Sequence, residues 1–245
     1  MYDIVIPLRR ALLNEELRYT VRSIQKNMPG RTIWFSGYRP KFFAGKVNVV
    51  ENSTLEGNKY NKSHSNQMAA CKDPRVSDTF LLFNDDFFVM QPITEFEDAH
   101  RGLVTDRIAE LEKLIGASGS LNALKLTLDI LKELGVEDPV DYGLHIPLTV
   151  NKKKWLEAWK IQMEHNPEKK PVHMRTVYGN LNNVANRQMD DIKISDKLTA
   201  PRGDEPFLSS NDDSFNTGKV GDYIREKFPD LCELEGRVNN TTMLK

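Results

Sequence analysis

Two adjacent carboxylates interrupt an apolar stretch in the first half of the chain, in the segment Phe80-Leu81-Leu82-Phe83-Asn84-Asp85-Asp86-Phe87-Phe88-Val89-Met90. The run 79–83 is short, unbroken and rich in β-formers, which is typical of a strand buried on both faces. Carboxylates at the end of such a strand are costly unless a positive group meets them, and divalent cations prefer carboxylate oxygens. In open α/β sheets, ligands bind beyond the carboxyl ends of the strands. Asp85 and Asp86 are therefore predicted to hold a metal, Mg or Mn, where a metal-bound phosphate would lie.

The tripeptide Asn-Asp-Asp also has a simpler interpretation. Asn and Asp favour turns, so Asn84 to Asp86 could be only the turn of a hairpin between two apolar runs. A second copy, Asn211-Asp212-Asp213, follows another apolar start at Phe207. Two copies of one rare tripeptide indicate two parts of one polar site, although no wider repeat is visible.

The elements before the first Asn-Asp-Asp alternate between strand and helix. Short β-rich runs predict strands at 2–6, 32–36 and 47–50, and Asn14 is a candidate N-cap for a helix over 15–27. Arg18 and Arg22 share one face of that helix. A helix over 65–72 is predicted next, with Ser63 as its N-cap and Lys62 just before it, which favours an anion site. The bland alternative is solvated arginines and lysines. This order is the opening of a nucleotide-binding α/β fold.

Two amphipathic helices, predicted at 106–115 and 122–134, form a helical hairpin. It is interpreted as an insertion at about 103–136 in a single catalytic domain over 1–245, and could be a lid, an acceptor platform or an oligomer contact. After the hairpin come His145 in a short apolar segment, a helix over 152–165, an extended segment over 172–178 and a terminal helix over 218–228. A lone histidine is more often structural than catalytic.

The composition of the chain limits the partners and the cellular compartment that can be expected. The 245 residues carry 34 Lys and Arg against 35 Asp and Glu, a net charge of −1. Such a balance makes nucleic acid an unlikely partner and offers no polybasic run for a membrane surface. No signal peptide and no membrane span are expected. Cys71 and Cys232 are far apart and are expected to be reduced thiols of a cytoplasmic protein.

Several segments, in this order, resemble the motifs of the Stealth family of sugar-phosphate transferases. The segments are Glu16–Ile24, Ser77–Phe88, His145–Pro147 continuing to Arg175, Phe207–Asp212 and Phe228–Glu235. The family includes bacterial capsular polysaccharide phosphotransferases and the catalytic subunit of the lysosomal-enzyme GlcNAc-phosphotransferase. The resemblance covers most of the chain outside the hairpin. It implies a nucleotide-sugar-binding fold of the glycosyltransferase-A type, a mixed sheet flanked by helices.

The resemblance implies a transferase that moves sugar-1-phosphate from a nucleotide-sugar to a hydroxyl of a glycan or other acceptor, as in polysaccharide biosynthesis. Asp85, Asp86 and Asp212 would hold the metal, and Asp212 or Asp213 could instead orient His145. His145 would be the base for the acceptor hydroxyl. Arg175 would hold the transferring phosphoryl oxygens. The other donor-binding candidates are Arg18, Arg22, Lys62, Ser63 and Asn84.

The opening of the chain departs from the family pattern. The family continues its first strand into an acidic loop of the type TWVDGSD, whereas here Pro7-Leu8-Arg9-Arg10 follows the strand. The sequence therefore leaves metal-dependent glycosyl transfer on the same fold as an alternative reaction. A catalytically inactive module that binds sugar or nucleotide is the alternative from outside the enzymes.

Overall fold

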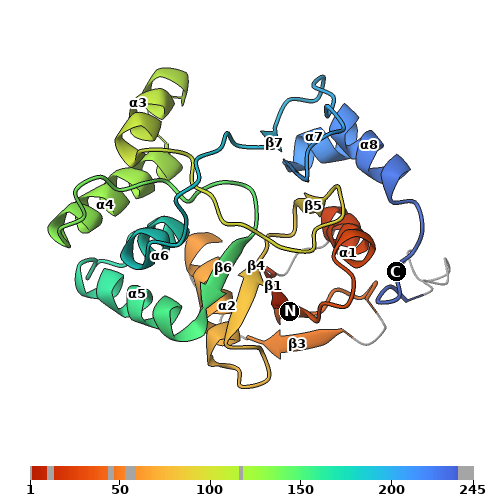
Figure 1. Cartoon of the computed structure of the whole chain (residues 1–245), viewed down its shortest axis with the longest axis horizontal. Helices are drawn as coiled ribbons and strands as arrows, with labels where there is room; N and C mark the ends of the chain where they lie inside the picture. Colours follow the sequence, from red (N-terminus) through yellow and green to blue (C-terminus); the bar gives the residue numbers. More distant parts are fainter. Residues whose placement is uncertain (1, 10–13, 44–46, 53–58, 116–117, 237–245) are drawn as a thin grey trace.

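A mixed sheet positions the acidic segment. The computed structural model describes residues 2–9, 14–43, 47–52, 59–115 and 118–236. Within these residues five strands form the larger sheet, in the order β3-β2-β1-β4-β6 (Figure 1). Their bounds are β1 Asp3–Pro7, β2 Ile33–Gly37, β3 Asn48–Glu51, β4 Thr79–Leu82 and β6 Leu148–Asn151.

The strand order places a topological switch point between β1 and β4. The chain runs outward from β1 through β2 to β3, then returns to add β4 on the other side of β1. These four strands are parallel, and only β6 runs antiparallel, against β4. A crevice opens at such a switch point beyond the carboxyl ends of the strands, and that is where a ligand binds in folds of this type. The segment after β4 contains Asp85 and Asp86 and lies at this edge.

Helices cover both faces of the larger sheet, as the unbroken apolar strands predict. Ile4 and Ile6 point into a core under α1, whereas Val5 points into a core under α2, α5 and α6. The helices are α1 Glu15–Asn27, α2 Lys59–Lys72, α3 Val104–Ile115, α4 Gly119–Glu133, α5 Lys152–Glu164, α6 Met174–Asn182, α7 Asp212–Thr217 and α8 Lys219–Lys227.

The chain enters a smaller sheet directly after the acidic segment. Three strands of the described chain form it in the order β5-β8-β7, with bounds β5 Phe87–Val89, β8 Phe207–Ser210 and β7 Lys193–Ile194. Phe88, Leu208 and Phe215 belong to its core, which α7 and α8 complete. Figure 1 shows this sheet, α7 and α8 grouped beside α1.

A polar stripe on α1 fixes the backbone of the acidic segment. The Thr20 hydroxyl donates to the Asp85 carbonyl at 2.7 Å, the Ser23 hydroxyl accepts from the Val89 amide at 2.9 Å, and the Asn27 side chain donates to the Val89 carbonyl at 2.6 Å. All three side chains are buried, where an unmade hydrogen bond is costly. The stripe therefore holds Asp85 and Asp86 in a defined position at the end of β4.

Ser23→Ala is expected to lower the free energy of unfolding by about 1–3 kcal/mol, because the buried Val89 amide would lose its acceptor. Urea denaturation followed by circular dichroism measures this change. The matched control is Ser195→Ala, since Ser195 is exposed. Equal stability of the two variants would mean that the stripe does not hold β5.

The predicted strands and most predicted helices are confirmed within a few residues. Two local predictions are wrong. The segment 172–178, expected to be extended, is mostly in α6, because Met174, Val177 and Tyr178 form a helical apolar face that packs toward Trp155. Ser63 does not cap a helix, since α2 begins at Lys59 and Ser63 lies inside it. The two helices of the predicted hairpin are α3 and α4, and they contact each other. Among the described residues, no helix is long and apolar enough to cross a membrane.

Candidate active site

Asp85 and Asp86 lie at the switch point and face different elements. Asp85 accepts a 2.7 Å hydrogen bond from the side chain of Asn14, which also caps α1. Asp86 accepts from the Ser209 hydroxyl at 3.1 Å and from the Lys193 ammonium at 3.2 Å. The side chain of Asp86 is 14% exposed. The pair is thus held between α1 on one side and the smaller sheet on the other.

Glu16, in the first turn of α1, is an acidic neighbour that the sequence analysis did not single out for the site. It accepts a 2.9 Å hydrogen bond from the Ser210 hydroxyl. Burial, with the nearby charges of Asp86, Asp85 and Asp212, raises the pKa of Glu16 to about 7. Burial and the charge of Asp86 also raise the pKa of Asp85. Negative charge is therefore crowded at this edge of the sheet.

This crowding of carboxylates indicates whether the site could hold a divalent cation. Within the described ranges, no three His, Cys, Asp or Glu side chains are arranged to hold a metal ion by themselves. Mg²⁺, however, is usually held by one or two carboxylates together with substrate phosphates and waters rather than by an all-protein cage. Asp85 and Asp86 fit that kind of site, because a bound cation would stabilise the charged form of carboxylates whose pKa values are raised by burial and by their mutual repulsion.

The other two predicted catalytic residues lie against the side chain of Phe87, which is buried. Phe87 directly follows Asp86 in the chain. The His145 ring lies edge-on to it with 6.2 Å between ring centroids, and the Arg175 guanidinium lies 5.8 Å from its centroid. His145 and Arg175, which are far apart in the sequence, therefore both lie against the ring of the residue that follows Asp86. The charge of Asp86 is among those that favour the charged form of Arg175.

Arg175 is held in an electrostatically unusual place. It donates to the Ile146 carbonyl at 2.5 Å, and its Nε atom is buried without a hydrogen-bond partner among the described residues. Burial lowers the pKa of Arg175 to about 10, although four surrounding carboxylates favour its charge. These are Asp98, Asp141, Asp191 and Asp86. The guanidinium stays charged at neutral pH, and an unsatisfied buried donor is a feature that a bound ligand can explain.

His145 is paired with Asp191, a residue that the sequence analysis missed. The His145 Nδ1 atom lies 2.8 Å from Asp191 Oδ2, and the His145 amide donates to Asp191 Oδ1 at 3.0 Å. Arg101 donates to the same carboxylate at 2.5 Å. The available sequence signal was the pair Asp190-Asp191, a further Asp-Asp dipeptide beside those at 85–86 and 212–213.

A cavity of about 490 Å³ has Asp191 and Lys193 in its lining. Asp191 contacts His145 and Lys193 contacts Asp86, so this cavity lies beside the partners of both residues, although neither His145 nor Asp86 lines it. The rest of its lining comes from 189–194 and 199–206.

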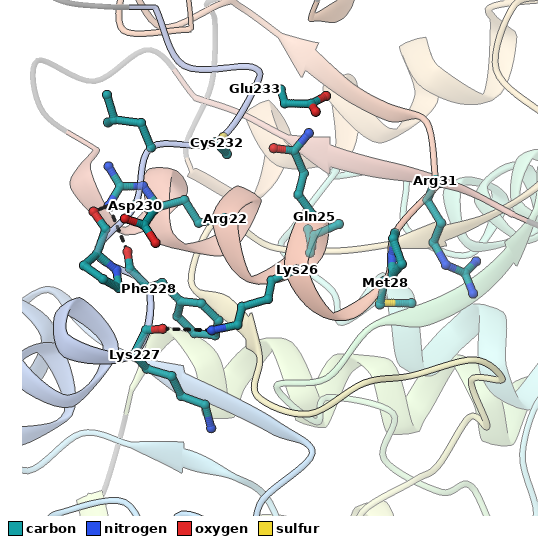
Figure 2. A pocket seen from close by; sticks show the side chains of 15 residues that line it. Arg22, Gln25, Lys26, Met28, Arg31, Lys227, Phe228, Asp230, Cys232 and Glu233 are labelled. Carbon is teal, nitrogen blue, oxygen red and sulfur yellow. Dashed lines mark hydrogen bonds between the residues drawn. The ribbon is translucent and has the colours of Figure 1, made fainter.

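Arg22, a predicted donor-binding residue, lies instead in a buried ion pair. Its guanidinium donates to both carboxylate oxygens of Glu235, at 2.7 and 3.0 Å, and to the Phe228 carbonyl at 2.9 Å. Figure 2 shows Arg22 pointing toward the segment around Phe228, where a cavity of about 410 Å³ opens beside the carboxyl-terminal half of α1. Arg18 also approaches Glu235, at 3.7 Å. The structure therefore gives Arg22 a structural role, because its side chain joins α1 to the segment 228–235.

Glu235→Gln is expected to lower the free energy of unfolding at pH 7 by about 3–5 kcal/mol, because it leaves the Arg22 charge buried and unpaired. Burial alone would raise the pKa of Glu235, but the hydrogen bond from Arg22 and its charge lower the pKa below its ordinary value of 4.5. A lowered folded-state pKa means that this stability is present above about pH 4.5 and is lost as the pH falls through the folded-state value.

Urea denaturation at pH 7 and at pH 3.5 measures the effect of Glu235→Gln. Glu233→Gln is the matched control, since Glu233 is exposed. If both variants were equally stable at pH 7, the ion pair would not anchor α1.

The other predicted site residues lie near the same edge of the sheet, and they differ in exposure and in the element that carries them. Asn84 is exposed and directly precedes Asp85. Lys62 and Ser63 lie in the first turns of α2, where Asn66 joins the helix to the Leu8 carbonyl at the end of β1. Asp212 is exposed at the first position of α7, and its charge is among those that raise the pKa of Glu16. Their roles stay predictions.

Comparisons with known proteins show the fold. No protein-family model matches the sequence, and no curated protein matches it. The chain is similar to the crystal structure of the galactosyltransferase LgtC in complex with donor and acceptor sugar analogues, with a TM-score of 0.53 and 12% identity over 94% of this chain and 96% of that chain. A structure of an active-site mutant of LgtC has a TM-score of 0.49 and 11% identity, again over 94% of this chain and 96% of that chain.

The apo-form glycosyltransferase GlyE from Streptococcus pneumoniae TIGR4 has a TM-score of 0.46 and 12% identity, over 92% of this chain and 59% of that chain. The fold is therefore a mixed α/β fold of the glycosyltransferase-A type, as predicted. Membership of the Stealth family is not shown by these comparisons and stays a prediction.

Proposed function

We propose that this protein transfers sugar-1-phosphate from a nucleotide-sugar to the hydroxyl group of an acceptor such as a glycan. One observation carries the proposal, namely that His145 and Arg175 both lie against the ring of Phe87, the residue that directly follows Asp86 at the switch point of the sheet. It brings together an anionic centre, a candidate base and a cation that can face a phosphoryl group. These are the parts that phosphoryl transfer to a hydroxyl needs.

The donor would lie beyond the carboxyl ends of β1 and β4, with its diphosphate toward Asp85 and Asp86. A divalent cation, Mg or Mn, held by Asp85 and Asp86 and completed by Asp212 or by the donor, would neutralise phosphate charge. Lys62, Ser63 and Asn84 lie at the same edge and are proposed to contact the nucleotide-sugar. Lys193, already 3.2 Å from Asp86, adds a positive charge there.

In the transfer step the acceptor oxygen attacks the phosphorus nearest the sugar. The new bond joins that oxygen to phosphorus, the phosphorus–oxygen bond to the second phosphate breaks, and nucleoside monophosphate leaves with the bonding electron pair. His145 takes the hydroxyl proton as the bond forms. The acceptor is proposed to approach from the cavity that Asp191, the partner of His145, helps to line.

Arg175 would hold the equatorial oxygens of the transferring phosphoryl group. Charge spreads over these oxygens in the transition state, and a guanidinium stabilises them through two parallel hydrogen bonds. Its buried Nε, without a partner among the described residues, supports this role, since a phosphoryl oxygen would supply the missing acceptor.

Glycosyl transfer is the second candidate function. The observation that favours it is the similarity of the fold to the galactosyltransferase LgtC over nearly the whole chain. In that reaction the acceptor would attack the sugar carbon, and nucleoside diphosphate would leave. His145 would again be placed to take the acceptor proton.

Assays with a panel of UDP-, GDP- and CMP-sugars test the proposed function. Isothermal titration measures donor binding, and nucleotide release in the presence of candidate sugar acceptors measures turnover. The proposal requires both, with turnover dependent on Asp86. Donor binding without turnover across donors and acceptors would contradict it and favour an inactive binding module.

Removal of divalent metal is expected to lower turnover by about 10³-fold or more, because several kcal/mol of phosphate charge stabilisation would be lost. Nucleotide release measured after EDTA treatment, and again after adding back MgCl₂ or MnCl₂, checks this. Full activity in EDTA would contradict a role for the metal, and neutralisation of the phosphate charge would then fall to Lys193 and Arg175 alone.

A further inference from the structure

We propose that Asp191 and Arg101 are positioning residues that fix His145 with Nε2 free to accept a proton. The inference deepens the proposed function, because it rests on His145 as the base. It concerns which ring nitrogen is basic and which residues decide this.

The carboxylate of Asp191 holds both the ring and the backbone of His145. Oδ2 lies 2.8 Å from the ring Nδ1, and Oδ1 accepts from the His145 amide at 3.0 Å. Two contacts from one rigid carboxylate fix the ring relative to its own backbone. The edge of the ring against Phe87 restrains it further.

The protonation state of Asp191 decides the tautomer of His145. Burial alone would raise the pKa of Asp191, but the hydrogen bond from His145 and the positive charges of His145 and Arg101 hold it well below its usual range. Asp191 is therefore ionised at neutral pH and can only accept hydrogen bonds. The proton of the neutral imidazole must then be on Nδ1, which leaves the lone pair on Nε2.

Arg101 fixes Asp191 in turn. It donates to Asp191 Oδ2 at 2.5 Å and to the Gly143 carbonyl at 3.0 Å, and it lies 3.5 Å from Asp141. The Arg101 side chain is only 14% exposed, so solvent competes weakly with these contacts. The segment before His145 and the carboxylate that binds its ring are thus held by one guanidinium.

The network continues to the helix that carries Arg175. Asp141, which is 2% exposed, accepts from the Thr176 hydroxyl at 3.0 Å and from the Gly143 amide at 2.8 Å. Thr176 follows Arg175 directly in α6. Asp191, Arg101 and Asp141 therefore connect His145 to the helix of Arg175. One network of hydrogen bonds and ion pairs thus fixes the positions of both residues.

Nitrogen NMR of protein labelled with ¹⁵N-histidine tests the inference without any substrate. The His145 signals are assigned by their loss in His145→Gln. The wild type is expected to show a protonated Nδ1 and an unprotonated Nε2 at neutral pH. Asp191→Asn is expected to lose this tautomer preference and to lower kcat by about 100-fold while leaving the donor Kd unchanged. Asp191→Glu, which keeps the charge, should retain the tautomer.

Asp129→Asn is the matched control, because Asp129 is an exposed aspartate of α4 that does not line the cavity beside Asp191. It should leave the tautomer and kcat as in the wild type. A wild-type spectrum with the proton on Nε2, or an unchanged spectrum in Asp191→Asn, would overturn the inference. If Asp191→Asn fails to fold, the wild-type and Asp191→Glu spectra still decide. A protein that turns over no donor but shows the expected tautomer would refute the proposed function and leave the positioning of His145 standing.

Discussion

Asp86→Asn is expected to abolish transfer, with a loss of about 10³-fold or more in kcat. Asparagine keeps the shape of the side chain, but it removes the negative charge that faces Lys193 and that would help to hold a cation. In the proposed mechanism, the charge of the leaving nucleotide is then no longer neutralised, and the barrier rises by several kcal/mol. Nucleotide release at saturating donor measures the loss.

The second Asn-Asp-Asp supplies a matched control for Asp86→Asn. Asp213 is exposed and its nearest ionic partner is Lys197 at 3.5 Å, so Asp213→Asn should retain activity. Circular dichroism and thermal melting check that both variants are folded. Unaltered activity in a folded Asp86→Asn would exclude a role for Asp86 in the reaction.

His145→Ala is expected to stop transfer while sparing donor binding. Loss of a general base costs about 10²–10⁴-fold in rate. Donor affinity should stay, because the proposed donor contacts come from the edge of β1 and β4 rather than from His145. Isothermal titration with the donor and a turnover assay, made on the same preparation, separate the two effects.

His165→Ala is the control for His145→Ala, since His165 is exposed at the end of α5 and pairs with Glu133 at the end of α4 at 3.0 Å. It should be fully active. Loss of donor binding together with turnover in His145→Ala would mean that His145 is a structural residue that supports the site.

Local patterns were sufficient to predict the frame of this molecule. The strand that precedes Asp85 is a short apolar run, which predicts a buried strand, and β4 does lie inside the larger sheet between β1 and β6. The N-cap Asn14 and the helix 15–27 are likewise set by neighbouring residues, and they are confirmed. The helix of Arg175 was missed because Val172, Thr176 and Val177 favour extended structure locally, whereas packing on Trp155 decides for helix.

Partners across the chain could not be predicted in the same way. Arg18 and Arg22 do share a helix face, but the carboxylate that meets Arg22 comes from Glu235, and no local pattern pairs residues so far apart. Lys193 reaches Asp86, and Asp191 reaches His145, only because β7 pairs with β8 next to β5. The acidic pair was visible in the sequence, whereas the residues that neutralise and orient the site depend on sheet topology.

Identification of the nucleotide released from UDP- and GDP-sugars tests the proposed reaction most directly. The protein is incubated with each donor, a panel of sugar acceptors and Mg or Mn, and the products are separated by anion-exchange chromatography. Sugar-phosphate transfer predicts release of nucleoside monophosphate, with the phosphate nearest the sugar retained on the sugar and joined to the acceptor. Release of nucleoside diphosphate would contradict it and would assign glycosyl transfer to this site.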